Sequence, residues 1–406
     1  MNRPFRLTRA RTSQRIAAAR TQWHAMIVLL LVAAISTAGL ASAQSPQVHV
    51  PRSLQNLDFG SVAYMPSIVC GACHGDIYEV WRESVHAQAY KDPLFQAGMR
   101  EAVAIAQSEG IKGICMTCHA PAGLMVTAKP ENDLRIAEGI GCDFCHSVKG
   151  ADLEQFGAFD IGPSNTAYGP FADAESPKHE TVYSEFMGTA GYCATCHEYR
   201  SRAGAPILTT FTEYAQGQYE QQLVACQDCH MPLVMGTTVE EHIKRTGRTE
   251  FVGFHAIPGG RDISQLRRAL GLEIVALTPA SGSVSVRVNI ENRAAGHWLP
   301  TGMPSRQLVL EVSTQWGDRV HSKEVVFGRK VFNADDELLT SVASMILEGA
   351  KVSIDTRLRP GQSRNVVQVL PAPQDAQVTL VVRCFYRSTE DPDAPVEDIH
   401  RIERVI

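Results

Sequence analysis

A five-residue pattern, Cys-x-x-Cys-His, occurs five times in this chain and uses ten of its eleven cysteines. We number the copies motif one to motif five, in the order 70–74, 115–119, 142–146, 193–197 and 226–230. The pattern is an attachment site for c-type haem, in which two thiols bond the porphyrin and the adjacent His reaches the iron. A zinc site does not require a His directly after each cysteine pair, and a disulfide framework does not impose the triplet. Five copies therefore predict five covalently bound haem c groups.

The motifs also specify which residues would hold each haem. The residues expected to bond the porphyrins are Cys70, Cys73, Cys115, Cys118, Cys142, Cys145, Cys193, Cys196, Cys226 and Cys229. The expected proximal iron ligands are His74, His119, His146, His197 and His230. Cys384 is the cysteine left over. It falls on the apolar side of an alternating run, which favours a buried inert thiol over an intermolecular disulfide.

Residues 1–43 have the composition of a secretory signal peptide. Six arginines and no acidic residue precede an apolar run over 25–40, and Ala41-Ser42-Ala43 fits a cleavage site before Gln44. The alternative is an uncleaved membrane anchor, because the apolar run approaches the length that spans a bilayer. Haem c is attached outside the cytoplasm, which agrees with export. We expect a periplasmic protein, with membrane anchoring or a cell-surface location as alternatives.

The charge balance limits the class of partner. Without the six arginines of residues 1–43, 32 Lys and Arg face 43 Asp and Glu. An acidic chain argues against nucleic acid and anionic membrane as partners. The expected partners are redox proteins, whose identity as donor or acceptor the sequence does not give. A membrane-associated electron-transfer complex and self-association through a C-terminal domain both stay open.

The chain changes character after the last motif. Residues 44–265 carry all five motifs, with short helices expected at 76–90, 93–108 and 132–138 and an irregular Gly- and Pro-rich spacer at 147–192. Five haems in about 200 residues leave little room for another core. We expect a mainly helical and irregular multihaem cytochrome c domain whose core is filled by haem.

Residues 266–406 have the period of two that is typical of strands. Apolar residues alternate with polar ones over 284–290, 308–312 and 378–386, with turn signals between the runs. This pattern predicts an all-β, sandwich-like domain. The loop Gly296-His297-Trp298-Leu299-Pro300-Thr301-Gly302 is either a corner of that domain or its contact with the haem domain.

The sixth position of each iron decides what it can do. An iron with two strong ligands passes electrons, whereas an open position can bind a small molecule. The histidines best placed as distal ligands are His86, His179, His255, His297 and His242. His86 follows His74 by twelve residues, so it is better placed for a neighbouring haem than for its own. Ligation by two His, without Met, favours low reduction potentials.

The motif region resembles the multihaem c-type cytochromes, in particular the tetrahaem cytochrome c of the hydroxylamine-oxidation pathway. Besides the motifs, the resemblance over 66–260 rests on Trp81-x-x-Ser84-x-His86, on Gly169-Pro170-Phe171 before His179, and on Met231-Pro232 after motif five. It implies that His86 and His179 are distal ligands to haems of other motifs. The chain departs from that family in having a fifth motif and a β domain.

Two functions follow as hypotheses. The first is an exported pentahaem cytochrome that transfers electrons through closely packed, mostly bis-His haems and has no catalytic residue. The second is a multihaem oxidoreductase that converts a small nitrogen or sulfur compound at one open haem. No motif replaces its His by Lys, the substitution that marks pentahaem nitrite reductases, so we expect an electron carrier rather than an enzyme.

Overall fold

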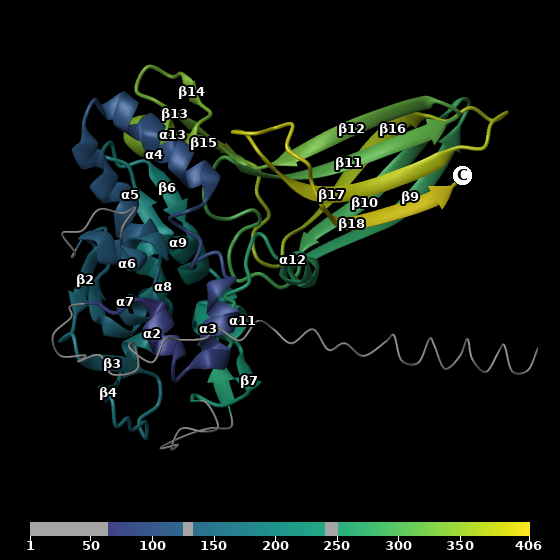
Figure 1. The fold of residues 1–406 in the computed structure, drawn as a ribbon. Helices are drawn as coiled ribbons and strands as arrows, with labels where there is room; N and C mark the ends of the chain where they lie inside the picture. Colours follow the sequence, from purple (N-terminus) through teal and green to yellow (C-terminus); the bar gives the residue numbers. More distant parts are fainter. Residues whose placement is uncertain (1–63, 125–132, 240–250) are drawn as a thin grey trace, which may run out of the picture. The chain divides into compact units, whose positions relative to one another are not determined.

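The computed structural model describes residues 64–124, 133–239 and 251–406, which belong to one compact unit of the chain (Figure 1). The predicted signal segment 1–43 and the predicted ligand His242 lie outside these residues. In the part of the chain that is described, no helix is both long and apolar enough to cross a membrane.

Short helices carry the five motifs. Motif one begins in the last turn of α2 (Ser67–Gly71) and ends at His74, the residue that precedes α3 (Gly75–Arg82). The other motifs lie in α5 (Lys112–His119), α7 (Cys142–Ser147), α8 (Ala190–His197) and α11 (Cys226–His230). Residues three and four apart face the same side of a helix, so one turn directs both cysteines and the His of a motif to one side.

The remaining helices of this region are α4 (Pro93–Ala106), α6 (Leu134–Ala137), α9 (Thr210–Ala215), α10 (Gln218–Gln221) and the 3₁₀ turns η2 (Glu109–Ile111), η3 (Pro121–Leu124) and η5 (Phe186–Gly188). The helix expected at 93–108 is confirmed as α4. Asp92 caps it by accepting from the backbone N–H of Leu94 and Phe95, and Pro93 occupies its first turn. The helix expected at 76–90 is shorter, because α3 ends at Arg82 and turns follow.

The prediction of a wholly irregular spacer at 147–192 is wrong. Strands β1 (Val148–Asp152) and β2 (Ala158–Ile161) pair antiparallel, and β3 (Thr166–Gly169) and β4 (Glu180–Tyr183) pair parallel. Two further ribbons join β5 (Glu198–Arg200) to β6 (Pro206–Thr209) and β7 (Leu233–Met235) to β8 (Phe251–Gly253). These short strand pairs provide hydrogen-bond partners for backbone N–H and C=O groups of segments that the Gly-rich sequence had suggested were irregular.

The C-terminal region consists of antiparallel sheets that follow α12 (Ile263–Ala269). One sheet has the order β16 (Ser363–Pro371), β10 (Ser283–Asn292), β9 (Leu270–Ala280). A second has the order β12 (Arg319–Phe327), β11 (Arg306–Trp316), β17 (Thr379–Ser388), β18 (Asp398–Val405). A small sheet of β14 (Leu338–Leu339), β13 (Arg329–Phe332) and β15 (Lys351–Asp355) lies with α13 (Val342–Glu348).

The two larger sheets bury one common apolar cluster. Val286 and Val288 of β10 meet Leu308 and Leu310 of β11 there, and all four side chains are fully buried. The period of two read from the sequence is therefore the burial pattern of the strands, and the expected β domain is confirmed. Cys384 belongs to the same cluster, and burial raises its pKa to about 12, so the leftover thiol is buried and inert.

The motif region has no apolar cluster of comparable size among its described residues. One small cluster gathers around Tyr64 and Phe144, and another around Ala102 and Ile111. The middle of the region is instead enclosed by the motif helices. A core that protein side chains do not fill is what a haem-filled domain requires.

Candidate haem-binding cavity

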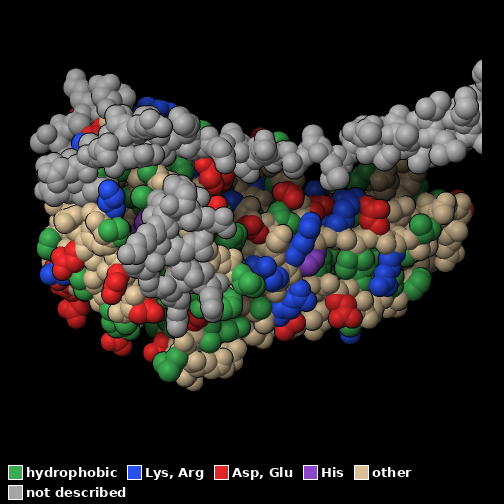
Figure 2. All heavy atoms as spheres, turned by 60° about the horizontal axis from the view of Figure 1, so that its bottom comes forward, with side chains coloured by type: hydrophobic (Ala, Val, Ile, Leu, Met, Phe, Trp, Pro, Cys, Tyr) green, Lys and Arg blue, Asp and Glu red, His purple; other side chains and the backbone are tan. Residues whose placement is uncertain are grey.

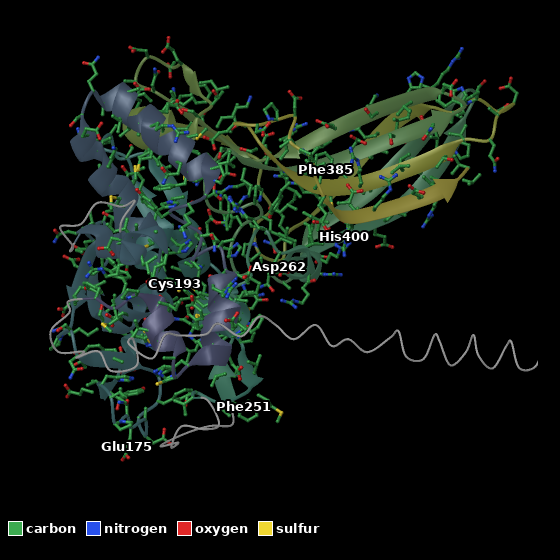
Figure 3. All side chains as sticks on the ribbon, viewed as in Figure 1. Glu175, Cys193, Phe251, Asp262, Phe385 and His400 are labelled. Carbon is green, nitrogen blue, oxygen red and sulfur yellow. The ribbon has the colours of Figure 1, made fainter. Side chains whose placement is uncertain are left out.

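One continuous cavity of about 2410 Å³ runs through the motif region. All ten motif cysteines line it, together with nine histidines. Ordinary small-molecule pockets measure roughly 300–1,000 Å³. The cavity is thus large enough for several bulky apolar groups, and its residues are those that bond and ligate haem c. Figure 3 labels Cys193 among the short helices of this region.

Eight of the nine histidines face each other in four pairs. The distances between ring centres are 6.3 Å for His74–His179, 6.3 Å for His86–His197, 6.5 Å for His146–His255 and 6.3 Å for His230–His297. Each pair joins one motif His to one histidine from elsewhere in the chain. The sequence expected such partners, but it did not give the pairing.

The spacing of these pairs fits a metal between the rings. Two imidazoles that hold one metal at about 2 Å from each nitrogen have ring centres about 6 Å apart. Rings in direct stacking contact lie closer, as Phe95 and His119 do at 3.9 Å. The four similar values therefore match iron ligation by two His better than packing.

Backbone hydrogen bonds fix which ring nitrogen is free. The Nδ1–H of His146 donates to the carbonyl of Tyr168 at 2.8 Å, and that of His255 donates to Gly253 at 2.6 Å. The same bond is made by His74 to Thr238, His119 to Ala89, His179 to Glu180, His230 to Pro258 and His297 to Trp298. A carbonyl can only accept, so Nδ1 carries the proton and Nε2 keeps the lone pair that a metal needs.

Burial keeps three of these imidazoles neutral. It lowers the pKa of His86, His197 and His255 to about 4, so each is uncharged at neutral pH. The neutral ring is the form that binds a metal. The Nδ1 of His86 has no hydrogen-bond partner, which distinguishes it from the seven rings that donate to a carbonyl.

Cysteines of different motifs lie next to each other. The thiol of Cys70 is a hydrogen-bonding neighbour of Cys142, and that of Cys193 of Cys226. The Sγ of Cys118 lies 4.0 Å from the carbonyl oxygen of Cys196. Motifs one and three, four and five, and two and four are therefore spatial neighbours, although each pair except four and five is separated in sequence by another motif.

His119 of motif two differs from the other motif histidines. Within residues 64–124, 133–239 and 251–406, its ring pairs with no second imidazole and stacks on Phe95 instead. The remaining described histidines lie in the β sheets: His321 stacks on Trp316 at 4.9 Å, and His400 bonds the Leu270 carbonyl (Figure 3). The predicted candidate His242 is outside the described residues.

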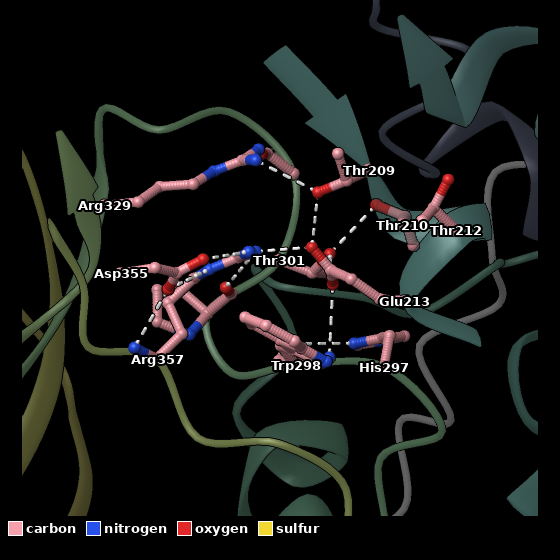
Figure 4. A network of polar contacts seen from close by, with 12 residues as sticks. Thr209, Thr210, Thr212, Glu213, His297, Trp298, Thr301, Arg329, Asp355 and Arg357 are labelled. Atoms are coloured by element: carbon pink, nitrogen blue, oxygen red, sulfur yellow. Dashed lines mark hydrogen bonds and ion pairs between the residues drawn. The ribbon is translucent and has the colours of Figure 1, made fainter. Parts of the chain in front are cut away.

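His297 reaches the cavity from the β domain, in the loop 296–302. A buried carboxylate on α9, Glu213, anchors that loop (Figure 4). Glu213 accepts from the Trp298 backbone N–H at 3.1 Å and from the Thr301 hydroxyl at 2.7 Å. Of the two alternatives for the loop, contact with the haem domain is thus confirmed.

An ion pair completes this anchor. Arg357 contacts Glu213 at 2.5 Å and Asp355 at 2.7 Å, and both members of the Arg357–Glu213 pair are only 4% exposed. Although burial lowers the pKa of Arg357, its bond to Asp355 and the charge of Glu213 outweigh this, so the pKa is raised. Its guanidinium also lies 4.8 Å from the centre of the Trp298 ring. Sequence reasoning missed Glu213, because one acid in a polar helix gives no signal.

The comparisons with known proteins agree with this geometry. A family model described as "Cytochrome c554 and c-prime" matches residues 69–147, which include motifs one to three. A penta-heme cytochrome c552 from Thermochromatium tepidum has a similar structure, with a TM-score of 0.68 and 22% identity over 85% of this chain and 99% of that one. Residues 69–147 thus match a cytochrome c family, and the structural similarity shows a shared fold; both agree with the multihaem c-type cytochrome that the sequence predicted. Coverage of 85% also means that the shared fold extends into the β domain.

Two other similarities are partial. A β-ketoacyl-[acyl-carrier-protein] synthase III from Paracoccus denitrificans is 31% identical over 143 residues, which are 32% of this chain and 42% of that protein. The chain thus spans less than half the length of this curated relative. A β-glucosidase from Kluyveromyces marxianus aligns with 34% of this chain at a TM-score of 0.16, too low to support an argument.

Proposed function

We propose that the chain holds five haem c groups and transfers electrons among them, with four of the irons ligated by two His. The observation that carries this proposal is the set of four imidazole pairs with ring centres 6.3 to 6.5 Å apart. Haem supplies one-electron redox chemistry when bound. The histidines contribute neutral, oriented Nε2 ligands, and ligation by two His favours low potentials.

The contacts between cysteines support an order for the haem sites. Motif one adjoins motif three, and motif four adjoins both motif two and motif five. The Cys145 thiol of motif three also interacts electrostatically with Cys196 of motif four. We therefore infer a row one–three–four–five with motif two as a branch at motif four.

Distal histidines near one motif face the motif histidine of another, and these pairs connect the sites of the row. His86 follows motif one but faces the His of motif four, and His179 precedes motif four but faces the His of motif one. His255 follows motif five but faces motif three. Each of these segments therefore supplies a distal histidine to a haem that is attached to another segment. The distances between the haem sites are then set by the folded chain and not by a flexible link.

Substitution of distal ligands tests the bis-His assignment. In H179M, one component of an optical redox titration should move to higher potential, because Met ligation raises the potential of haem iron. The matched control is H321M, since His321 stacks on Trp316 in the β domain and should leave every component unchanged. An H179M titration that superimposes on the wild type would contradict the assignment.

The unpaired His119 supports a second candidate function. An iron held by His119 without a second imidazole could bind a small nitrogen or sulfur compound, which would make the protein a multihaem oxidoreductase. Assays of the reduced protein with nitrite, hydroxylamine and sulfite test this candidate. Reoxidation no faster than in buffer would exclude these three compounds as electron acceptors, and the absence of haem reduction when they are added to the oxidised protein would exclude them as donors.

Export to the periplasm and cleavage before Gln44 are part of the proposal. The Arg-rich start, the apolar run and Ala41-Ser42-Ala43 support them. N-terminal sequencing of protein from whole cells tests both points: a start at Gln44 is expected, and a start at residue 1 or 2 in the membrane fraction would mean an anchor.

We also infer that the C-terminal domain is a β-sandwich, because the inner faces of its two larger sheets share one core.

The proposed partners are other redox proteins rather than nucleic acid. On the face in Figure 2, acidic and basic side chains are interspersed instead of forming one basic field. Self-association through the β domain, or membership of a membrane-associated electron-transfer complex, is compatible with this surface. Light scattering on the purified protein separates a monomer from a self-associated form.

A further inference from the structure

Arg306, the first residue of β11, extends its guanidinium into the haem cavity. The Nη1 atom lies so close to Gly260 that a Cβ there would be only 2.6 Å from it. A Cβ on Gly302 would lie 3.8 Å from the same atom. Gly260 has no side chain that would displace the guanidinium, so the glycine keeps room for a charge at this point of the wall.

The two glycines line the same cavity, each in a segment that adjoins one histidine of the pair His230–His297. Gly260 follows Pro258, whose carbonyl accepts from the Nδ1–H of the motif-five ligand His230 at 2.5 Å. Gly302 ends the loop that carries His297, the imidazole that faces His230. Arg306 therefore lies beside two segments of the chain, one that contacts His230 and one that carries His297.

The guanidinium of Arg306 has no anionic partner in the described part of the chain. Its one recorded side-chain contact is with the ring of Tyr386, whose centre is 5.8 Å from Cζ. Burial raises the pKa of Tyr386 to about 12, so this phenol is neutral. The nearby Arg261 has a like charge and is itself paired with Asp92 at 2.6 Å. The guanidinium, which has five N–H donors, thus lines the cavity with no side-chain acceptor among the described residues.

Such an arrangement is unfavourable unless an anion completes it. Arg306 is half-buried, and a charge partly removed from water without a partner is unfavourable, whereas a guanidinium and a carboxylate form two parallel hydrogen bonds. Haem c carries two propionates, which are carboxylates at the edge of the ring. We propose that Arg306 pairs with a propionate of the haem held by motif five, so that the β domain supplies that haem with both the ligand His297 and a counter-charge. This inference rests on the proposed occupation of motif five.

We expect Arg306 to raise the reduction potential of the haem held by motif five. A positive charge beside a haem favours the reduced state, which has one more electron, over the oxidised state. We expect R306Q to lower the reduction potential of one component by at least about 59 mV, which corresponds to a tenfold change in a one-electron reduction equilibrium. The number of attached haems and the low-spin spectrum should not change.

The chain offers a matched control in Arg364. Its Cζ also lies 5.8 Å from an aromatic ring centre, that of Phe327, but it does not line the cavity. R364Q should titrate as the wild type does. R306K keeps the charge without the fork and should shift the component less than R306Q, which keeps the test informative if R306Q folds poorly.

Three results would overturn the proposal. The first is an R306Q titration that matches the wild type, and the second is an R306K shift as large as that of R306Q although lysine keeps the charge. A shift in the wild type that depends on added phosphate, nitrite or sulfite would mean that Arg306 binds a free anion instead. Intact-mass determination separates the inferences: fewer than five haems would refute the proposed function, whereas five haems with no effect of R306Q would refute this inference alone.

Discussion

The E213Q variant tests how the β domain holds His297. The Glu213 carboxylate accepts four hydrogen bonds, from the Thr209 hydroxyl at 2.6 Å, Arg357 at 2.5 Å, the Trp298 N–H at 3.1 Å and the Thr301 hydroxyl at 2.7 Å. Glutamine has one acceptor oxygen and an NH₂ group that faces donors, so about half of these bonds are lost.

The magnitude follows from the burial of the pair. Removal of one partner of a buried ion pair costs about 3–5 kcal/mol. Arg357 keeps Asp355 as a second carboxylate, which lowers the expected loss to about 3 kcal/mol. Because Trp298 and Thr301 lie directly in the loop of His297, we also expect one haem to lose its low-spin character.

The assay combines denaturant unfolding with the ferric optical and paramagnetic resonance spectra. The matched control is E311Q: Glu311 pairs with Arg383 at 3.1 Å on a sheet of the β domain, where both side chains are partly exposed. That variant should lose about 1 kcal/mol or less and keep the wild-type spectrum. If E213Q loses stability but its spectrum is unchanged, Glu213 does not position His297. If it behaves as E311Q does, the estimate for the buried pair is wrong.

Three further outcomes are expected. Burial raises the pKa of Glu138 from 4.5 to about 7, so the folded protein binds more protons than the unfolded chain between these values; its stability should fall as pH rises through that window by on the order of 3 kcal/mol, and E138Q should remove this slope in urea titrations at pH 4.5 to 8. G139A should destabilise the protein and disturb the low-spin signal of one haem, because Gly139 has φ +71° and a Cβ would lie 2.5 Å from the His86 carbonyl; an unchanged spectrum and midpoint would contradict this. L310A should cost about 2–5 kcal/mol, since Leu310 is fully buried between the sheets, and it should leave the haem spectrum unchanged if the β core and the haem sites are independent.

The sequence predicted the parts of this protein whose signal is local. The motif spacing predicted which cysteines and histidines would hold haem, because thioether and iron bonds restrict residue type and separation at once, and the structure brings these residues to one cavity. The alternation over 284–290 identified a strand, because one face of a sheet is buried. The helix at 93–108 was recognisable from Asp92, Pro93 and an apolar stripe.

What the sequence could not give depends on contacts between distant segments. The spacer 147–192 forms two strand pairs that bond mainly through the backbone, so their side chains carry no strong period. Which motif His faces which distal His depends on the path of the whole chain. Glu213 and Arg306 have meaning only beside the loop of His297, and neither stands in a recognisable motif.

The predicted haem and β domains both contribute residues to the cavity. His297 and Arg306 both come from residues after 265, yet they border the cavity of the motif region. A chain that ended before β9 would lack His297 and Arg306, the proposed ligand and counter-charge for motif five. For this reason, partner binding by the β domain is better tested with surface variants in the full chain than by its deletion.

The most direct test of the account is the ferric spin state of the purified protein, followed by electron paramagnetic resonance with and without nitric oxide. The account predicts five haems, four of them low-spin and unresponsive to nitric oxide because two His hold each iron. One high-spin haem that binds nitric oxide would identify His119 as the ligand of an open iron and favour the oxidoreductase. Two or more haems that bind nitric oxide would contradict the four imidazole pairs and with them the central claim.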